Sequence, residues 1–325
     1  MQRLIFILLT LLLSGNTFGQ NYDFGKISKS ELKEKYHPTD SSIAAAVLYK
    51  NEDISFFYSD NDGFIQQRDV HQRIKIYSKE GFDWATKKIY LYAGDSNNKE
   101  TLTGLKAFSY NLVNDKIEKE KLRKDGEFEE DYNEFTKVNS FTMPEVKEGT
   151  VIEYKYRITT KSVSIDDVIF QYSIPINKLE VKIAIPEYYV FNQRLNLRAA
   201  FLPKLNNETR NNTVPFDFKT NITFIDESNV PPLKSEAYSG NLDNYRSKMS
   251  LELTAFLNSY KVVEKSFSTT WEKVSKTIYE SSNFGGQLRK FNFYKDELNA
   301  LITGVTDDFE KALLVENFVK SKIKW

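Results

Sequence analysis

The chain has 325 residues and carries 45 basic and 45 acidic side chains, so its formal net charge is zero. It contains no basic block or stripe, and a nucleic-acid-binding protein needs a concentrated positive surface, so we expect no nucleic-acid partner. The chain also contains no cysteine, which excludes disulfides, a thiol nucleophile and a lipidated N-terminal cysteine.

Residues 1–20 have the pattern of a secretory signal peptide. Arg3 supplies the positive start, an apolar run of about ten residues follows, and small residues surround a cleavage site near Gly19 or Gln20. A membrane span needs roughly 20 apolar residues, so we favour a cleaved signal over an uncleaved anchor. The sequence therefore predicts an exported protein, periplasmic or extracellular, with no membrane span after signal cleavage.

From about residue 43 to residue 260 the hydrophobic pattern has a period of two, which indicates strands with one buried face. In residues 70–77 the apolar side chains fall on one face, and the opposite face carries His71, Arg73, Lys75 and Tyr77. Residues 151–158 and 249–255 alternate in the same way. We expect a mainly β protein built as an antiparallel β-sandwich, either one large sandwich or two in tandem with a sub-boundary near residue 175.

Turn residues separate these predicted strands. Asn61-Asp62-Gly63 lies between two strand patterns and predicts a tight hairpin. An EF-hand calcium loop would need its glycine at the sixth position, which places Tyr58 at the first ligand position, so the calcium motif does not fit. Residues 203–215 contain four asparagines between two prolines and are expected to form a long polar loop.

After about residue 262 the period changes to 3.6, which predicts helices. Ser268 or Thr269 is expected to cap the first helix, and Gly285-Gly286 to end it with a flexible turn. A shorter helix is predicted over residues 295–301. Asp307 caps the last helix, whose wide apolar face indicates packing against a core.

Candidate catalytic residues are few. His37 and His71 are the only histidines, and no Gly-x-Ser-x-Gly elbow accompanies them. The acidic runs 129–131 and 166–167 could in principle supply paired carboxylates, but neighbouring residues of a strand point to opposite faces. We therefore predict no catalytic, cofactor-binding or metal-binding residue, and no enzyme activity in this chain.

Tyr90 and Tyr92 form the remaining candidate ligand face, because they share one face of a predicted strand. Aromatic rings on a sheet can stack on sugar or peptide, although they more often pack across strands. Both interpretations stay open at this point.

Several segments in order resemble the Bacteroidetes-type exported proteins that join a DUF3857 β-domain to a transglutaminase-like core. The most specific segment is Phe141-Thr142-Met143-Pro144-Glu145-Val146-Lys147-Glu148-Gly149-Thr150-Val151-Ile152-Glu153-Tyr154-Lys155-Tyr156. The others are Val70–Tyr77 with Gly81, Phe170-Gln171-Tyr172 with Pro175, Lys182–Pro186, Asn229-Val230-Pro231-Pro232-Leu233 with Glu236, and Trp271 opening a helix.

The resemblance implies a signal peptide over residues 1–20, a DUF3857-like β-region over 21–262, and over 263–325 the helical start of a transglutaminase-like α+β core. In that family a Cys–His–Asp triad performs papain-like acyl transfer or amide hydrolysis, and no triad residue maps onto this chain. The implied function is a non-catalytic accessory module that positions a peptide, glycan or partner for the downstream core. The alternatives are the leading segment of an active protease, amidase or transglutaminase, and a free-standing binding or scaffolding protein.

The resemblance also implies that Trp325 precedes the catalytic part of the core, whether the end there is natural or fragmentary. The last helix would then lack the surface that its apolar face needs. Six large apolar side chains at roughly 1.5–3 kcal/mol each amount to about 10 kcal/mol of missing stabilisation. We expect residues 306–325 to fray or aggregate while the β-region stays folded.

Overall fold

The computed structural model describes residues 22–236, 238–267, 270–290 and 293–323. These residues belong to two compact units, Met1–Lys265 and Ser266–Trp325. The signal peptide expected over residues 1–20 lies outside the described residues. Within the described part, no helix is both long enough and apolar enough to cross a membrane.

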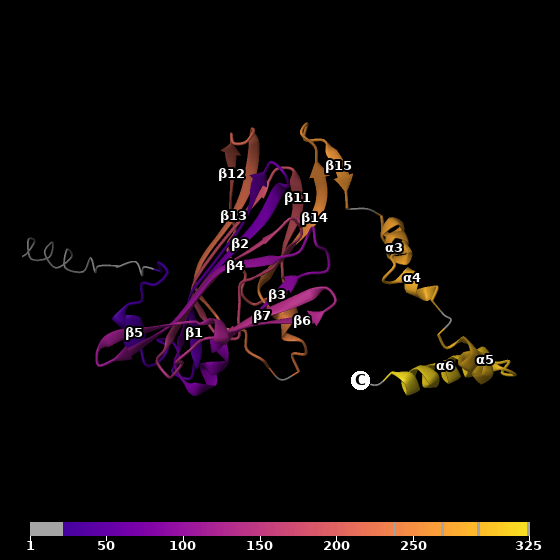
Figure 1. The fold of residues 1–325 in the computed structure, drawn as a ribbon, viewed down its shortest axis with the longest axis horizontal. Coiled ribbons are helices and arrows are strands. Elements are labelled where there is room, and N and C mark those ends of the chain that lie inside the picture. The colour runs from indigo at the N-terminus through magenta and orange to yellow at the C-terminus, as the bar shows by residue number, and fades with distance from the viewer. Residues whose placement is uncertain (1–21, 237, 268–269, 291–292, 324–325) are drawn as a thin grey trace, which may run out of the picture. The chain divides into compact units, whose positions relative to one another are not determined.

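The first unit is dominated by an eight-stranded sheet (Figure 1). Its strands follow the order β12-β13-β10-β1-β2-β8-β4-β5. Their bounds are β1 Ala45–Ser59, β2 Gly63–Ile76, β4 Thr101–Val113, β5 Lys116–Lys121, β8 Val151–Thr160, β10 Ile176–Pro186, β12 Asn206–Asn212 and β13 Phe218–Val230. The turn predicted at Asn61-Asp62-Gly63 joins β1 to β2, and Gly63 has a φ of +72° there.

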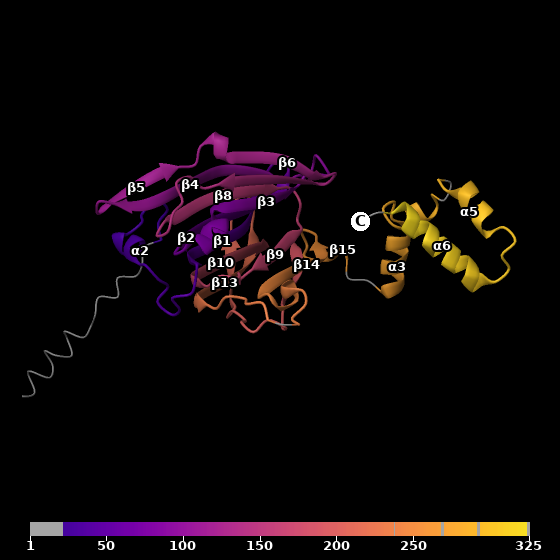
Figure 2. The ribbon, with the colours of Figure 1, turned by 90° about the horizontal axis from the view of Figure 1, so that it is seen from below.

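Two smaller sheets complete the first unit (Figure 2). One has the order β3-β7-β6, with β3 Thr86–Tyr92, β6 Glu127–Asn133 and β7 Thr136–Thr142. The other has the order β11-β14-β15 with β9 also paired to β14, and its strands are β9 Ile165–Ile169, β11 Tyr189–Leu195, β14 Lys248–Leu257 and β15 Val263–Ser266. Short helical turns connect the strands: η1 Lys79–Ala85, η2 Lys124–Gly126 and η3 Leu242–Tyr245.

The predicted mainly β, antiparallel-rich fold is confirmed. The pairing of β1 with β10 is parallel, however, and the sequence did not reveal it. A parallel pair needs a long crossover connection, and here the chain between the two strands contains β2 to β9. Consequently β10, which follows the predicted sub-boundary near residue 175, belongs to the same sheet as β1.

All three sheets contribute to one hydrophobic core. The large sheet supplies Ile54 and Ile74, the β3-β7-β6 sheet supplies Ile89, and the β14 sheet supplies Val168 and Met249. Each of these side chains is at most 4% exposed, and full burial of one such side chain contributes roughly 1.5–3 kcal/mol. The sheets are therefore layered on a shared core.

The long polar loop predicted over residues 203–215 is wrong in its central part. Residues 206–212 form β12, which pairs with β13 at the edge of the large sheet. Six of its seven side chains are exposed and the seventh is half-buried, so neither face carries the apolar alternation that marks a strand. Pairing with β13, and not side-chain burial, determines this strand.

The second unit contains four helices within the described residues: α3 Trp271–Glu280, α4 Gly285–Leu288, α5 Lys295–Ile302 and α6 Asp308–Lys322. Thr270 caps α3 by accepting a hydrogen bond from the backbone of Lys273, whereas the predicted caps Ser268 and Thr269 lie outside the described residues. The flexible turn predicted at Gly285-Gly286 is wrong, because these residues begin α4. The prediction that Asp307 caps α6 is confirmed, since its carboxylate accepts from the backbone of Glu310.

The N-terminal segment, residues 22–44, covers the outer face of the large sheet. Its helix α2 (Lys29–Lys33) places Leu32 against Leu48, Tyr110 and Val151 in a second, smaller hydrophobic cluster. The strand pattern predicted only one buried face for β2, but Arg73 and Lys75 on the opposite face are also fully buried. The N-terminal segment that buries Arg73 and Lys75 has no strand periodicity, so the sequence pattern did not indicate that this face of β2 is covered.

Candidate functional site

An open cavity of about 790 Å³ lies beside β3. Residues from the two smaller sheets border it, together with the connections that join β3 to β4 and β8 to β9. The lining residues are Tyr90, Leu91, Tyr92, Asn98, Glu100, Thr136, Lys161, Ser162, Val163, Ser164, Asp166 and Phe256. A cavity of this size falls in the range of small-molecule and peptide sites.

The two tyrosines singled out from the sequence both border this cavity. Tyr90 is 53% exposed and Tyr92 is 42% exposed, so neither ring is buried in the core. The Tyr90 ring meets Tyr132 of β6 edge-on, with 5.5 Å between ring centroids. Phe256 of β14 adds a third ring to the lining. The ring surface left open is available to a ligand.

Two carboxylates, those of Glu100 and Asp166, are among the polar side chains that line the cavity. Glu100 accepts a hydrogen bond from the backbone N–H of Tyr92 on Oε2, at 2.8 Å. Burial raises the pKa of the Glu100 carboxyl, and the negative charge of Asp166 raises it further. The hydrogen bond from the Tyr92 backbone lowers this pKa, but by less than the two other effects raise it. The two carboxylates therefore act on each other electrostatically.

The β8–β9 connection that lines the cavity is fixed by hydrogen bonds from the large sheet. The buried Gln66 amide of β2 donates to the carbonyls of Ser162 and Ser164, at 3.0 and 2.8 Å. Lys161 forms an ion pair with Asp62 of the β1–β2 turn at 2.6 Å. The cavity is thus preformed, because its connecting segment is held by β2 and by the turn before it.

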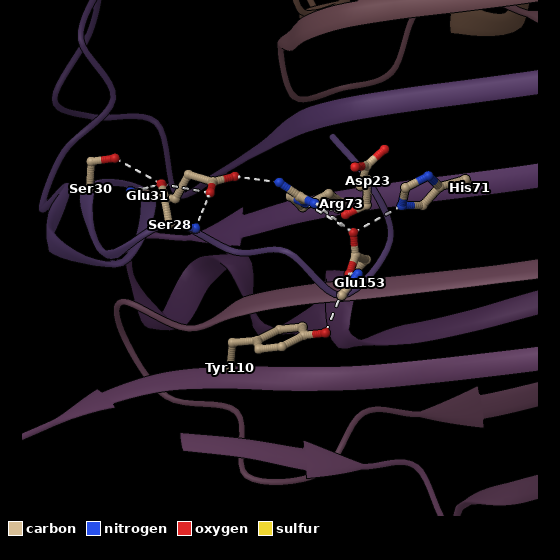
Figure 3. Close-up of polar contacts among 9 residues, drawn as sticks. Asp23, Ser28, Ser30, Glu31, His71, Arg73, Tyr110 and Glu153 are labelled. Carbon is tan, nitrogen blue, oxygen red and sulfur yellow. Dashed lines mark hydrogen bonds and ion pairs between the residues drawn. The ribbon is translucent and has the colours of Figure 1, made fainter. Parts of the chain in front are cut away.

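A second group of polar residues lies on the outer face of the large sheet (Figure 3). Arg73 bonds Oε1 of Glu153 through Nε and Nη2, at 3.0 and 2.8 Å, and Glu31 through Nη1 at 2.8 Å. Glu153 also accepts from His71 at 2.9 Å and from the backbone of Gly25 at 2.7 Å. This buried cluster fastens the N-terminal segment to β2 and β8.

The charge state of the cluster follows from these contacts. Burial alone would raise the pKa of the Glu153 carboxyl, but the hydrogen bonds from His71 and Arg73 and the charge of Arg73 outweigh burial and lower it. Burial would likewise lower the pKa of Arg73, but Glu153 and Glu31 raise it. Both groups are charged, and every partner in the cluster serves to hold the fold.

A third polar network lies inside the core. Glu52 bonds Arg68 at 2.5 Å and Lys50 at 3.4 Å, and the Lys50 ammonium also lies 5.0 Å from the centre of the Tyr172 ring. Gln72 donates to the Tyr172 hydroxyl at 2.8 Å. Lys50, Glu52 and Gln72 are at most 3% exposed, so this network is an internal support and not a ligand surface.

The remaining residues considered from the sequence are dispersed. His37 bonds Asn177 at 3.3 Å, and His71 bonds Glu153. Within the acidic runs, Glu129 pairs with Lys137, Asp167 pairs with Lys248, and only Asp166 reaches the cavity. The sequence did not single out Glu100 or Phe256, because neither belongs to a motif and only the tertiary structure brings them beside Tyr90 and Tyr92.

The fold and this site define a mainly β protein with an open, ligand-sized cavity at the edge of a small sheet. No protein-family model matches the chain, and no curated protein matches it. Among solved structures, the chain is similar to one described as a "putative protease" from Parabacteroides distasonis, with a TM-score of 0.56 and 14% identity. The match covers 86% of this chain and 51% of that one, so the chain spans about half the length of that neighbour. At this identity the likeness shows the fold alone.

A second solved structure is described as a "putative nutrient binding protein" from Legionella pneumophila. It matches with a TM-score of 0.26 and 12% identity, over 84% of this chain and 78% of that one. A TM-score this low supports no conclusion.

Proposed function

We propose that this chain is a non-catalytic, β-rich accessory module of an exported transglutaminase-like protein, and that it positions a ligand for a core that follows it. The cavity beside β3 carries the proposal. It has about 790 Å³ of open space, and it combines the exposed rings of Tyr90 and Tyr92 with polar and charged side chains. In binding sites aromatic side chains provide contact area and polar groups fix the orientation of the ligand.

Two further observations support an accessory role. The ordered sequence segments resemble the β-region that precedes a transglutaminase-like core, and the neighbour described as a protease is about twice as long as the match. The chain contains no cysteine, and its two histidines are bonded to Glu153 and Asn177. Recognition, rather than covalent chemistry, is the task that these residues can perform.

Binding to arrays of peptides and glycans, followed by calorimetric titration of the hits, tests the module. We expect saturable binding that weakens about tenfold or more when Tyr90 and Tyr92 are both replaced by alanine, since stacked aromatic contacts contribute about 0.5–1.5 kcal/mol each. Tyr36→Ala is the matched control, because this ring is 64% exposed and lies outside the cavity. If the wild-type chain retains no member of either array, the proposal is wrong.

The activity of the parent protein is a separate question. The resemblance to transglutaminase-like proteins leaves an active papain-like enzyme as the alternative. The coding DNA beyond Trp325 distinguishes the two: a cysteine at a helix start, followed by histidine and aspartate, indicates the enzyme, and substitution of the cysteine indicates a scaffold.

A further inference from the structure

The outer edge of β3 carries backbone groups that point away from β7, its one partner among the described strands. On the β7 side, the Ala85 carbonyl accepts a hydrogen bond from the Met143 N–H, and the Ala93 N–H donates to the Phe135 carbonyl. Hydrogen-bonded residues alternate along an antiparallel pair, so the N–H and C=O groups of Lys88 and Tyr90 face outward. Throughout the described ranges, no hydrogen bond to these groups is found.

The cavity meets this edge at Tyr90, and Leu91 and Tyr92 also border it. Glu100, which bonds the outward-facing N–H and C=O groups of Tyr92, lines the same cavity. The cavity therefore extends to the outward side of β3, toward which the open backbone groups of Tyr90 point.

Both ends of the free edge are defined. Toward β4, Tyr92 is already paired, since its carbonyl accepts from the Glu100 amide and its N–H donates to the Glu100 carboxylate, each at 2.8 Å. Toward η1, the N–H of Thr86 bonds the Asp83 carbonyl. The open stretch extends from the Thr86 carbonyl to Tyr90, which accommodates about four or five residues of an extended chain.

The charges around the cavity favour a cationic ligand. Lys161 is paired with Asp62, and Arg68 is paired with Glu52. In the part of the chain that the structure describes, no ion pair involves Glu100 or Asp166, the two carboxylates that border the cavity. Arg68 acts on Glu100 from a distance, and it shares Glu52 with Lys50. Four carboxylates, those of Glu52, Asp62, Glu100 and Asp166, thus stand against the three cations Lys50, Arg68 and Lys161, so the excess charge is negative.

We infer that an extended peptide with a basic side chain binds here as an added strand on β3. Its backbone would pair with Lys88 and Tyr90, one face would contact the tyrosine rings, and the basic group would reach Glu100 and Asp166. Strand addition of this kind takes affinity from main-chain hydrogen bonds and specificity from pockets for alternate side chains. The inference rests on the proposed function and specifies its ligand.

A proline scan of the edge tests the added strand. Proline at an outward-facing position of an edge strand removes an N–H without breaking the ladder to β7, so Lys88→Pro should fold. Lys88→Ala is the matched control, because it loses the same side chain and keeps the N–H. The probe is a capped five-residue peptide with a central lysine between valines and threonines, titrated against the full chain by calorimetry, with circular dichroism confirming the fold of each variant.

We expect the peptide to bind the wild type, Lys88→Ala to stay within about twofold, and Lys88→Pro to weaken binding about tenfold, through one lost hydrogen bond and the bulk of the ring. Replacing the central lysine by glutamate, N-methylating alternate peptide amides, or introducing Asp166→Asn should each weaken binding. Equal affinity of Lys88→Pro and Lys88→Ala overturns strand addition. A glycan that binds through Tyr90 and Tyr92, while no peptide binds, overturns the inference and preserves the proposed function; binding of neither class overturns both.

Discussion

Replacing Glu153 by glutamine tests whether the buried charges on the outer face hold the N-terminal segment. The substitution keeps the shape of the side chain and removes the negative charge that faces Arg73, whose own side chain is fully buried. Both Glu153 oxygens accept hydrogen bonds, from Arg73, His71 and the backbone of Gly25. The NH₂ group of the glutamine can only donate, so it would face another donor at one of these positions. One attraction is lost, and new donor–donor contacts are created.

The expected loss of unfolding free energy is about 3–5 kcal/mol, as for other buried pairs that lose one partner. The lower end applies if Glu31, 2.8 Å from Arg73, can neutralise the guanidinium alone. Urea unfolding of the full chain measures the change. Asp69→Asn is the control, since its pair with Arg157 is 37% and 47% exposed and should contribute no more than about 1 kcal/mol. A Glu153→Gln variant as stable as Asp69→Asn would refute the reasoning.

The pH dependence of stability provides a second measure of the same cluster. The pKa of Glu153 is lowered in the folded protein, so the unfolded chain binds more protons at this site. The stabilisation is therefore complete above the unfolded carboxyl pKa of about 4.3 and is lost as the pH falls through the folded value. The Glu153→Gln variant should lose less stability than the wild type on acidification below about pH 4.3.

The remaining predictions concern Lys75 and α6. Burial lowers the pKa of Lys75 in the folded protein to about 8. Between about pH 8 and the usual lysine pKa, Lys75 therefore binds more protons in the unfolded chain than in the folded one. The free energy of unfolding should rise with pH across this interval. Lys75→Met should remove the rise, measured by urea unfolding between about pH 8 and 9.5; an unchanged profile would contradict it. In α6, Phe309 is 78% exposed, Leu313 46% and Val319 44%, and a helix of 15 residues is marginal without packing. Amides 312–323 should exchange far faster than those of β2 by hydrogen-exchange mass spectrometry, and strong protection in a monomer would contradict this.

The sequence predicts the features that depend on local patterns. Alternation gave the mainly β class, as Val70, Ile74 and Ile76 illustrate by lying in the core. Capping chemistry located the start of α6 at Asp307, and Asn61-Asp62-Gly63 located the β1–β2 turn. Each of these features is decided by residues within a few positions of one another.

Features that depend on distant segments were not predictable. Arg73 and Lys75 occupy the face that alternation marks as polar, and only the covering N-terminal segment buries them. The strand β12 lacks any apolar period and exists because β13 offers it a partner. The pattern around Tyr90 could indicate an aromatic face, but Glu100 and Asp166 join it only through tertiary structure.

The locations of the polar groups separate stability from recognition. Arg73, Glu153 and Glu31 lie on the outer face of the large sheet and fasten the chain to itself, whereas Glu100 and Asp166 border the cavity without an ion pair among the described residues. The two sets share no residue and no hydrogen-bond partner. Changes at independent sites add, so weakening the outer cluster should lower the unfolding free energy without altering the affinity of the β3 edge. The proposed binding role requires this arrangement, because it leaves the open carboxylates and the unpaired strand edge to a ligand.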